Sequence, residues 1–436
     1  MICRVLAGLA ACSCVLATLT HFVVLSRPSG DHQVHPTEKL LVVDGSNFEE
    51  WRRRGDTRSQ RRHVWKVIAG LTKAASARGE PRFESWFGED EAFSTISSEH
   101  TSRGIRGFSR ESPASESAAS GGALQSADAP LLTYTLYNDA AYKHIRRNQL
   151  YLRSGLERLR RNGSPDNAIA DDRSVPTFPT DAVVVKTVWW PVAQGSITAL
   201  PVWDPEHNSP RQGGNSYIGW QRIVAVDAGK NSELDSTAQI DFAGRSFPHA
   251  HRVSLDAFYH VLVDTRMAER TMRDSGARMA AAIALGRSLR AGDYLVLVGA
   301  NLATRDIGDW VWAAIWWHDQ PDQGPFAADR PSELTSAWRN YLLQVAFDSD
   351  IPAAVDGGPH ICFNPWLEGR FPDGGHGGGT VSNCMTCHRR ASYPPASFLP
   401  VTRGDPDLTK DPAYGAGRLR TSFLWSIALH ARPGPP

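Results

Sequence analysis

The sequence predicts an α+β fold in which a mostly antiparallel sheet is flanked by helices. Residues 182–190 form a β-branched and aromatic run that stops at Pro191, and 222–226 has the same character before an Asp-Ala-Gly turn. Two further strand-like segments are 294–298 and 310–317. No internal repeat is visible. The mixture of these runs with helical segments therefore indicates α+β.

The clearest helix opens the main body. Its apolar residues recur at spacings of three, four or seven, which places them on one helix face. They are Tyr142, Ile145, Leu152, Leu156 and Leu159. Asp139 can cap the start of this helix and Asn162-Gly163 can end it. Helical spacing also covers 63–71, and the mixed stretch 254–289 is expected to be mostly helical.

Composition and charge suit a globular protein with an N-terminal extension. The chain has 436 residues, of which 41% are hydrophobic, enough for one large or two moderate cores. The formal net charge of +1 argues against a general nucleic-acid binder, so nucleic acid is not an expected partner. The expected parts are a signal peptide or membrane anchor at 1–27, an N-terminal segment that packs on the body at 28–108, a disordered linker at 109–130, the α+β body at 131–350, and a Gly/Pro-rich cofactor-attachment region at 351–436 that packs against the body.

The N-terminus indicates export. Arg4 precedes an almost uninterrupted apolar run over 5–25, long enough for a membrane anchor or the core of a signal peptide. The residues before Cys12 resemble a bacterial lipobox, which would make Cys12 a lipidation site. Anchor, lipoprotein and cleaved signal all place the body outside the cytoplasm. We therefore expect a bacterial periplasmic protein tethered to the membrane through its N-terminus.

The stretch Cys384-Met385-Thr386-Cys387-His388 carries the chemistry. Each thiol can add to one vinyl group of a haem, and the adjacent imidazole can then bind the iron. The stretch resembles the haem-binding signature of c-type cytochromes. The resemblance implies one covalent haem c, with Cys384 and Cys387 as thioether residues and His388 as an axial ligand. It covers only these five residues.

Other interpretations of the motif use the same side chains. It is half of a zinc site if Cys362 and His376 complete the shell, although structural zinc usually shows two closely spaced ligand pairs. It is a redox dithiol if it forms a disulfide, although a Gly-rich loop and not a βαβ unit precedes it. Export favours haem, because haem attachment takes place outside the cytoplasm in bacteria. Cys362 is expected to be a small buried apolar residue.

The sixth haem ligand is left open by the sequence. The tail after His388 contains one histidine, His430, and no methionine, which departs from small cytochromes. His318 ranks first as a distal group, because it follows an indole-rich strand at 310–317 that forms either a pocket wall or a dense core. His430 and His376 rank behind it. Weaker candidates are His360, Met267, Met272 and Met279. A further alternative is that the sixth position has no protein ligand, which would permit chemistry on peroxide or another small molecule.

Three functions are compatible with such a site. The first is an extracytoplasmic, membrane-tethered monohaem cytochrome that passes electrons to a redox partner protein in the periplasm. The second is a haem oxidoreductase, such as a peroxidase or small-molecule oxidase, with its substrate site in the α+β body. The third is a haem-based sensor or assembly module. Whether the chain is an enzyme is not decided by its sequence.

Overall fold

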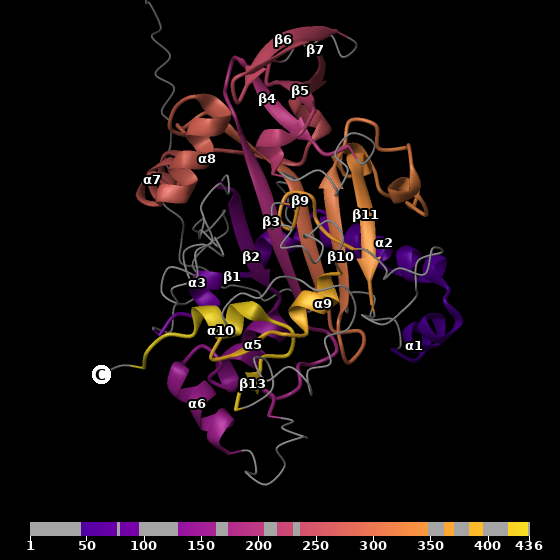
Figure 1. Cartoon of the computed structure of the whole chain (residues 1–436), viewed down its shortest axis with the longest axis vertical. Coiled ribbons are helices and arrows are strands. Elements are labelled where there is room, and N and C mark those ends of the chain that lie inside the picture. The colour runs from indigo at the N-terminus through magenta and orange to yellow at the C-terminus, as the bar shows by residue number, and fades with distance from the viewer. Residues whose placement is uncertain are drawn as a thin grey trace, which may run out of the picture. The chain divides into compact units, whose positions relative to one another are not determined.

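A central sheet of seven strands organises the protein, in the order β1-β2-β3-β9-β10-β11 with β8 also paired to β9. Every pairing in it is antiparallel. Its strands are β1 (Phe87–Gly88), β2 (Leu132–Tyr137), β3 (Val183–Val192), β8 (His260–Leu262), β9 (Tyr294–Thr304), β10 (Val311–Trp317) and β11 (Tyr341–Ala346). The expected α+β fold with a mostly antiparallel sheet is confirmed (Figure 1).

This computed structural model describes residues 45–75, 79–95, 130–162, 173–204, 216–229, 236–347, 362–369, 383–395 and 417–434. All of them belong to one unit, which begins at Lys39. The expected 1–27 leader with Cys12 lies outside the described residues, and so does the expected linker apart from Pro130. Among the helices that are described, none has the length and apolar character needed to cross a bilayer.

Two smaller sheets accompany the central one. The first has four strands in the order β4-β5-β7-β6, and its β5–β7 pair is parallel. Its strands are β4 (Ile197–Val202), β5 (Arg222–Asp227), β6 (Thr237–Phe242) and β7 (Arg245–Ser254). The second is the short ribbon of β12 (Ser392–Tyr393) and β13 (Leu419–Arg420), and its first strand follows closely after the cysteine motif.

The helices are short and lie around the sheets (Figure 1). The α-helices are α1 (Gly45–Arg54), α2 (Thr57–Thr72), α3 (Glu89–Ala92), α5 (Asp139–Arg147), α6 (Arg153–Arg161), α7 (Thr265–Arg273), α8 (Ser275–Leu285), α9 (Cys384–His388) and α10 (Trp425–His430). Single 3-10 turns are η1 (Arg82–Ser85), η2 (Tyr217–Gly219), η3 (Leu255–Ala257), η4 (Pro325–Ala327) and η5 (Ser336–Asn340). Asp56 caps α2, because its side chain accepts from the Ser59 amide.

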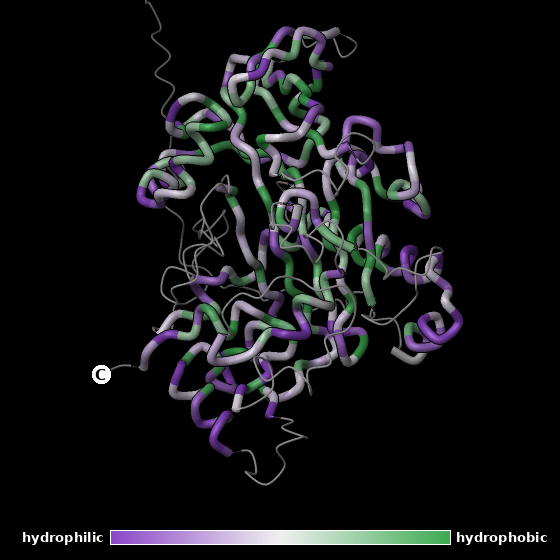
Figure 2. Tube along the Cα trace, viewed as in Figure 1, coloured by the Kyte–Doolittle hydropathy of each residue, from purple (hydrophilic) through white to green (hydrophobic). Residues whose placement is uncertain are grey.

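Successive side chains along a strand point to opposite faces of the central sheet, and each face packs into its own hydrophobic core. Val183 and Val185 of β3 belong to one core, and Val184 between them belongs to the other. The larger core contains α2, η1 and the four-stranded sheet, and the residues from 45 to 86 contribute Phe48 and Trp65 to it. The smaller core joins α5, α6 and the C-terminal segments. Figure 2 shows hydrophobic residues along the central strands and hydrophilic residues on α6.

The helix expected over 142–159 is broken in two, which corrects the sequence prediction. Gln149 takes a positive φ of 56°, and Leu152 is extended and forms a bridge with Arg432. The turn buries Leu150 completely in the smaller core. Asn138, not Asp139, caps α5, because its side chain accepts from the Ala141 amide at 3.0 Å.

Two other boundaries differ from expectation. β3 continues through Pro191, which pairs with Leu295 of β9. β2 ends its pairing with β3 at Trp189, so among the described strands none on that side of β3 needs the N–H that proline lacks. The stretch 254–289 contains η3 and β8 before α7 and α8, so it is only partly helical. The sequence-based prediction also missed β2, β4, β6, β7 and β11.

Candidate functional site

The CMTCH motif forms the short helix α9 on one face of the central sheet. Asn383 begins the helix, and its side-chain oxygen accepts from the Met385 amide at 2.9 Å. The Cys384 amide donates to the Cys362 carbonyl at 3.1 Å, which ties the helix to the segment 362–369. Cys384 and Met385 are buried in the same core as Trp312 of β10. The body of the protein therefore covers one side of the motif.

His388 is fixed by two contacts. Its Nδ1 lies 2.7 Å from the Phe423 carbonyl oxygen, which can only accept, so Nδ1 carries the proton. Its ring lies against the Trp312 indole, with ring centroids 3.9 Å apart and planes inclined by 32°. The remaining nitrogen, Nε2, holds a lone pair in the plane of the imidazole, and Trp312 covers only the face of the ring. This arrangement is the one that metal-binding histidines usually show.

A turn over 421–424 presents the carbonyl that orients His388. Ser422 and Phe423 both have positive φ, 51° and 66°. The Thr421 hydroxyl donates to the Leu424 carbonyl, and the Trp310 indole donates to Ser422 Oγ at 3.3 Å. The position of the Phe423 carbonyl is thus set by several contacts.

The two motif cysteines differ in their surroundings. The Cys384 thiol is 3.3 Å from the Cys362 carbonyl oxygen and 3.8 Å from Cys362 Sγ. Its contact with Cys362, together with burial, raises the pKa of Cys384. Cys387 is half-buried and makes no disulfide. Burial raises the pKa of Cys387 to about 11. Both side chains are neutral thiols at pH 7, and Cys387 is the more accessible one.

A row of polar side chains crosses the sheet beneath this site. Strand register pairs Lys186 of β3 with Asn301 of β9, and Gln344 of β11 lies in the same row. Asn301 donates to Glu368 Oε1 at 2.8 Å, and the Gln344 side-chain oxygen accepts from the Phe363 amide at 2.9 Å. These bonds attach the segment 362–369 to the sheet. No local sequence pattern reveals this row, because its members are far apart in sequence.

Two charged residues, Lys186 of this row and Glu368 beside it, act on the pKa values of the motif. Burial lowers the pKa of His388 to about 4, the Phe423 carbonyl opposes this effect, and the positive charge of Lys186 lowers the pKa further. The imidazole is therefore neutral at pH 7, as an iron ligand must be. Glu368 contributes negative charge near both motif cysteines and helps to raise their pKa values.

His318, the first-ranked distal group, is not brought to His388. It follows β10 and lies six residues beyond Trp312, or roughly 20 Å along a strand. There it joins a partly buried polar cluster, in which Arg222 donates to Asp319 Oδ2 at 2.7 Å and the Gln320 amide donates to His318 Nδ1 at 2.9 Å. Burial lowers the pKa of His318. We therefore do not assign His318 to the motif's site.

His430 lies at the far end of α10 from Trp425, the residue whose side chain approaches Cys387. Its Nδ1 is 3.2 Å from Glu89 Oε1, and its ring packs against Phe93. The structure thus gives His430 another partner. Met267 belongs to the larger core, and Met272 and Met279 are exposed on α7 and α8, far from α9 in Figure 1. His376 and His360 lie outside the described residues.

The four indoles of 310–317 are divided between two environments. Trp310 and Trp312 belong to the smaller core beside the motif, where Trp310 also packs on Phe178. Trp316 and Trp317 belong to the larger core, where Trp316 packs edge-on against Trp203. All four indoles are therefore buried core residues, and Trp312 is the one of the four whose ring also lies against His388.

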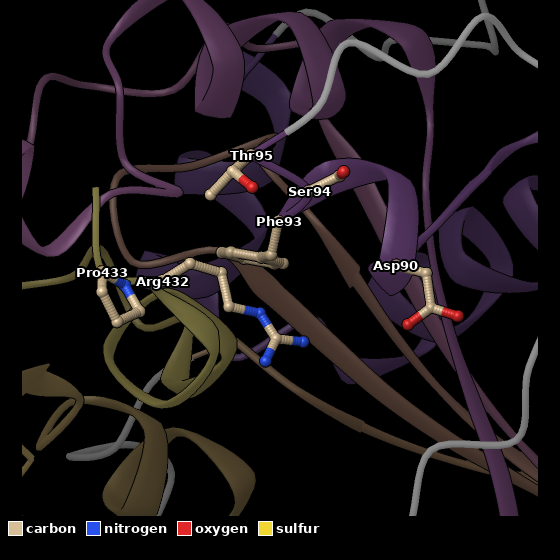
Figure 3. Close-up of a pocket in the computed structure, with 6 residues that line it drawn as sticks. All are labelled: Asp90, Phe93, Ser94, Thr95, Arg432 and Pro433. Carbon is tan, nitrogen blue, oxygen red and sulfur yellow. The ribbon is translucent and has the colours of Figure 1, made fainter. Parts of the chain in front are cut away.

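An open pocket of about 400 Å³ lies between α3 and the last described residues. It is lined by Asp90, Phe93, Ser94, Thr95, Arg432 and Pro433. Figure 3 shows the Arg432 guanidinium extending past Phe93 toward the side on which Asp90 lies. None of these residues belongs to the motif, so this pocket is a feature of the contact between the N-terminal and C-terminal segments.

Comparisons with known proteins do not assign the chain to a family. No family model, no curated protein and no solved structure matches it. The site must therefore be interpreted from its own residues.

Proposed function

We propose that the chain binds one covalent haem c, with Cys384 and Cys387 as thioether residues and His388 as an axial iron ligand. The single observation that carries this proposal is the bond from His388 Nδ1–H to the Phe423 carbonyl. It leaves Nε2 as the ligating atom and sets the direction of its lone pair. A histidine that served only packing would not need this orientation directly after a CxxC spacing.

The residues fit the group with one adjustment. Cys387 is half-buried and reachable, whereas the Cys384 thiol is turned toward the Cys362 carbonyl. Thiols are weak hydrogen-bond donors, so rotating Cys384 away costs little. When bound, the haem would supply a one-electron redox centre. The segments on both sides of the motif, 370–382 and 396–416, lie outside the described residues, so the far face of the ring is not assigned.

The proposed role is electron transfer by a periplasmic protein that its N-terminal segment tethers to the membrane. The partner would be a redox protein, because a site covered on one side by the body can exchange electrons at its other side without binding a substrate. The alternative is a haem oxidoreductase or sensor. A ferrous spectrum that carbon monoxide does not change supports electron transfer, and a spectrum that shifts supports the alternative.

The test of haem attachment uses the full chain made in a host with c-type haem maturation. Denaturing gels stained for haem should show the protein band. Cys384→Ala combined with Cys387→Ala should remove the stain. Cys362→Ala, a third cysteine of the same region, should retain it. An unstained wild-type band of normal abundance would exclude the proposal.

Zinc is the second candidate, and one observation favours it. Tetrahedral zinc holds thiolate sulfurs roughly 3.8 Å apart, and the Sγ atoms of Cys362 and Cys384 are 3.8 Å apart. Within the described residues, however, no group of three or more metal-binding side chains is present. A zinc site would therefore need a ligand from outside the described residues, for which His376 is the candidate. Metal analysis of the same preparation separates the two candidates, because zinc binding predicts one zinc and no haem, and His376→Ala would then release the zinc.

A further inference from the structure

Cys362 and Cys384 form a thiol pair that haem attachment does not use. Their Sγ atoms are 3.8 Å apart, and both residues are buried. A disulfide requires about 2.0 Å between the sulfurs. The two atoms are already in van der Waals contact, so side-chain rotation and a small shift of α9 are enough to join them.

The backbone holds this pair together. Cys362 forms an isolated bridge with Asn383, and the Cys384 amide donates to the Cys362 carbonyl at 3.1 Å. The segment that carries Cys362 is attached to the sheet, because the Phe363 amide donates to Gln344 and the Asn364 side chain donates to the Ile315 carbonyl at 3.2 Å. Once an oxidant has converted one thiol of such a pair into a mixed disulfide, the prearranged partner thiolate attacks it faster than a thiol in solution does.

We infer that Cys362 and Cys384 form a disulfide in the haem-free protein, and that this disulfide withholds Cys384 from haem attachment until it is reduced. The second half of this inference rests on the proposed haem function, but the first half does not. Cys362 would then be a regulatory residue of the site and not a passive core residue.

The chemistry needs an oxidant, which is a disulfide of a thiol–disulfide exchange protein or of a small molecule such as oxidised glutathione. The Cys387 thiolate, the more accessible of the two, attacks this disulfide and releases one thiol. The Cys384 thiolate then displaces the second thiol, giving Cys384–Cys387. Attack of the Cys362 thiolate on Cys384 Sγ releases Cys387 and leaves Cys362–Cys384. In total two protein thiols lose two electrons and two protons, and the oxidant becomes two thiols.

The test uses the full chain produced without haem maturation and equilibrated with mixtures of oxidised and reduced glutathione. Free thiols are blocked, and the protein is digested with trypsin without reduction. Arg370 lies between Cys362 and the motif, so trypsin separates the two parts unless a disulfide joins them. Mass spectrometry should find the Cys362 peptide joined to the motif peptide in the wild type. The same joined peptide should form more slowly in Cys387→Ser, where oxidised glutathione must react with Cys362 or Cys384 directly. It should be absent from Cys362→Ser and Cys384→Ser.

Two results would overturn the inference. In the first, the joined peptide is absent from the oxidised wild type, with Cys384–Cys387 as the only product. In the second, it survives in Cys384→Ser, which would place the bond on Cys387. Cys362→Ala serves as a second variant if the serine at this buried position disturbs folding.

Whether the Cys362–Cys384 disulfide keeps Cys384 from haem attachment is tested in a host that attaches haem. Under oxidising growth, the haem-bound fraction of Cys362→Ala should rise several-fold above that of the wild type, and added reductant should remove the difference. An unchanged fraction would contradict the regulatory role. If no variant carries haem while the joined peptide is found, the proposed haem function fails and the disulfide stands.

Discussion

At the scale of single residues, the site depends on backbone groups as much as on side chains. The Phe423 carbonyl orients His388, and the Cys362 carbonyl accepts from both the amide and the thiol of Cys384. Neither contact follows from residue type, because every residue has a carbonyl group. The motif itself could be recognised from the sequence, whereas the contacts that orient it required the fold.

Lys186 should raise the reduction potential of the proposed haem. Its positive charge already lowers the pKa of His388. Reduction removes one positive charge from the haem iron, so a nearby cation favours the reduced form. Lys186→Met should therefore lower the midpoint potential, by an amount on the order of tens of millivolts. Potentiometric titration followed by visible absorbance measures it.

Lys143→Met is the matched control for Lys186→Met. Lys143 is exposed on α5 and pairs with Asp139 at 2.7 Å. Solvent screens such a charge, so the potential should not change. Equal shifts of the midpoint potential in the two variants would show that the Lys186 charge acts on the haem no more strongly than a distant surface charge does.

Glu84 should give the protein a pH-dependent stability. Burial raises the pKa of Glu84 from 4.5 to about 7, and the Tyr259 hydroxyl donates to its carboxyl at 3.3 Å. The folded chain therefore binds this proton more tightly than the unfolded chain does. The stabilisation is fully present below the unfolded pKa and is lost as the pH rises through the folded pKa.

Glu84→Gln should remove this contribution. Urea denaturation gives the free energy of unfolding of both proteins, and the wild-type value minus the variant value should decline as the pH rises from about 4.5 to about 7.5. A difference that stays constant or increases over this range would show that the carboxyl titrates normally.

At the scale of elements, the strands that were predicted correctly have continuous apolar runs. β9 and β10 are buried on both faces and lie within the larger core as well as the smaller one. β6 and β7 escaped prediction because their exposed positions carry polar residues, and β7 includes a proline. The five-residue break between α5 and α6 was also missed, because the apolar spacing continues across it. Its cause is the tertiary bridge from Leu152 to Arg432.

Gly155→Ala tests this break. Alanine is favoured over glycine within a helix by roughly 1 kcal/mol, but a Cβ at this position would lie 2.3 Å from the Gln149 carbonyl oxygen. That atom belongs to the backbone and cannot move easily. We expect a net loss of about 1–3 kcal/mol in the free energy of unfolding.

The control for Gly155→Ala is Ser154→Ala, an exposed position of the same helix. It should change stability by less than about 0.5 kcal/mol. Thermal unfolding of both variants measures the difference. A Gly155→Ala variant more stable than the wild type would mean that α5 and α6 can rearrange into the continuous helix that the spacing suggests.

At the scale of the whole molecule, the described residues of the C-terminal region share their hydrophobic cores with the body. Cys362, Cys384 and Ile427 pack in one cluster with Trp312 and Phe178 of the body. The region was expected to pack against the body, because 389–436 holds one histidine and no methionine that could serve as a second ligand of a haem. The described residues agree with this expectation, because the body supplies the large side chains that pack against one side of the CMTCH motif.

A fragment from Ile351 to the C-terminus should therefore not fold alone. Its near-ultraviolet circular dichroism should be weak, and any attached haem should show a solvent-exposed, ligand-binding spectrum. The same fragment mixed with the separately produced body is the control, because restored signals would confirm that the shared core is what is missing. A well-folded fragment with the spectrum of the full chain would show that the tail is a complete cytochrome domain.

The central claim is the covalent haem, and intact mass spectrometry tests it most directly. The full chain is purified from a host with c-type haem maturation and measured under denaturing conditions. We predict a mass increased by one haem, which is retained after reduction and lost in Cys384→Ala with Cys387→Ala. A wild-type mass equal to that of the polypeptide alone, in a preparation where another c-type cytochrome is fully matured, would contradict it.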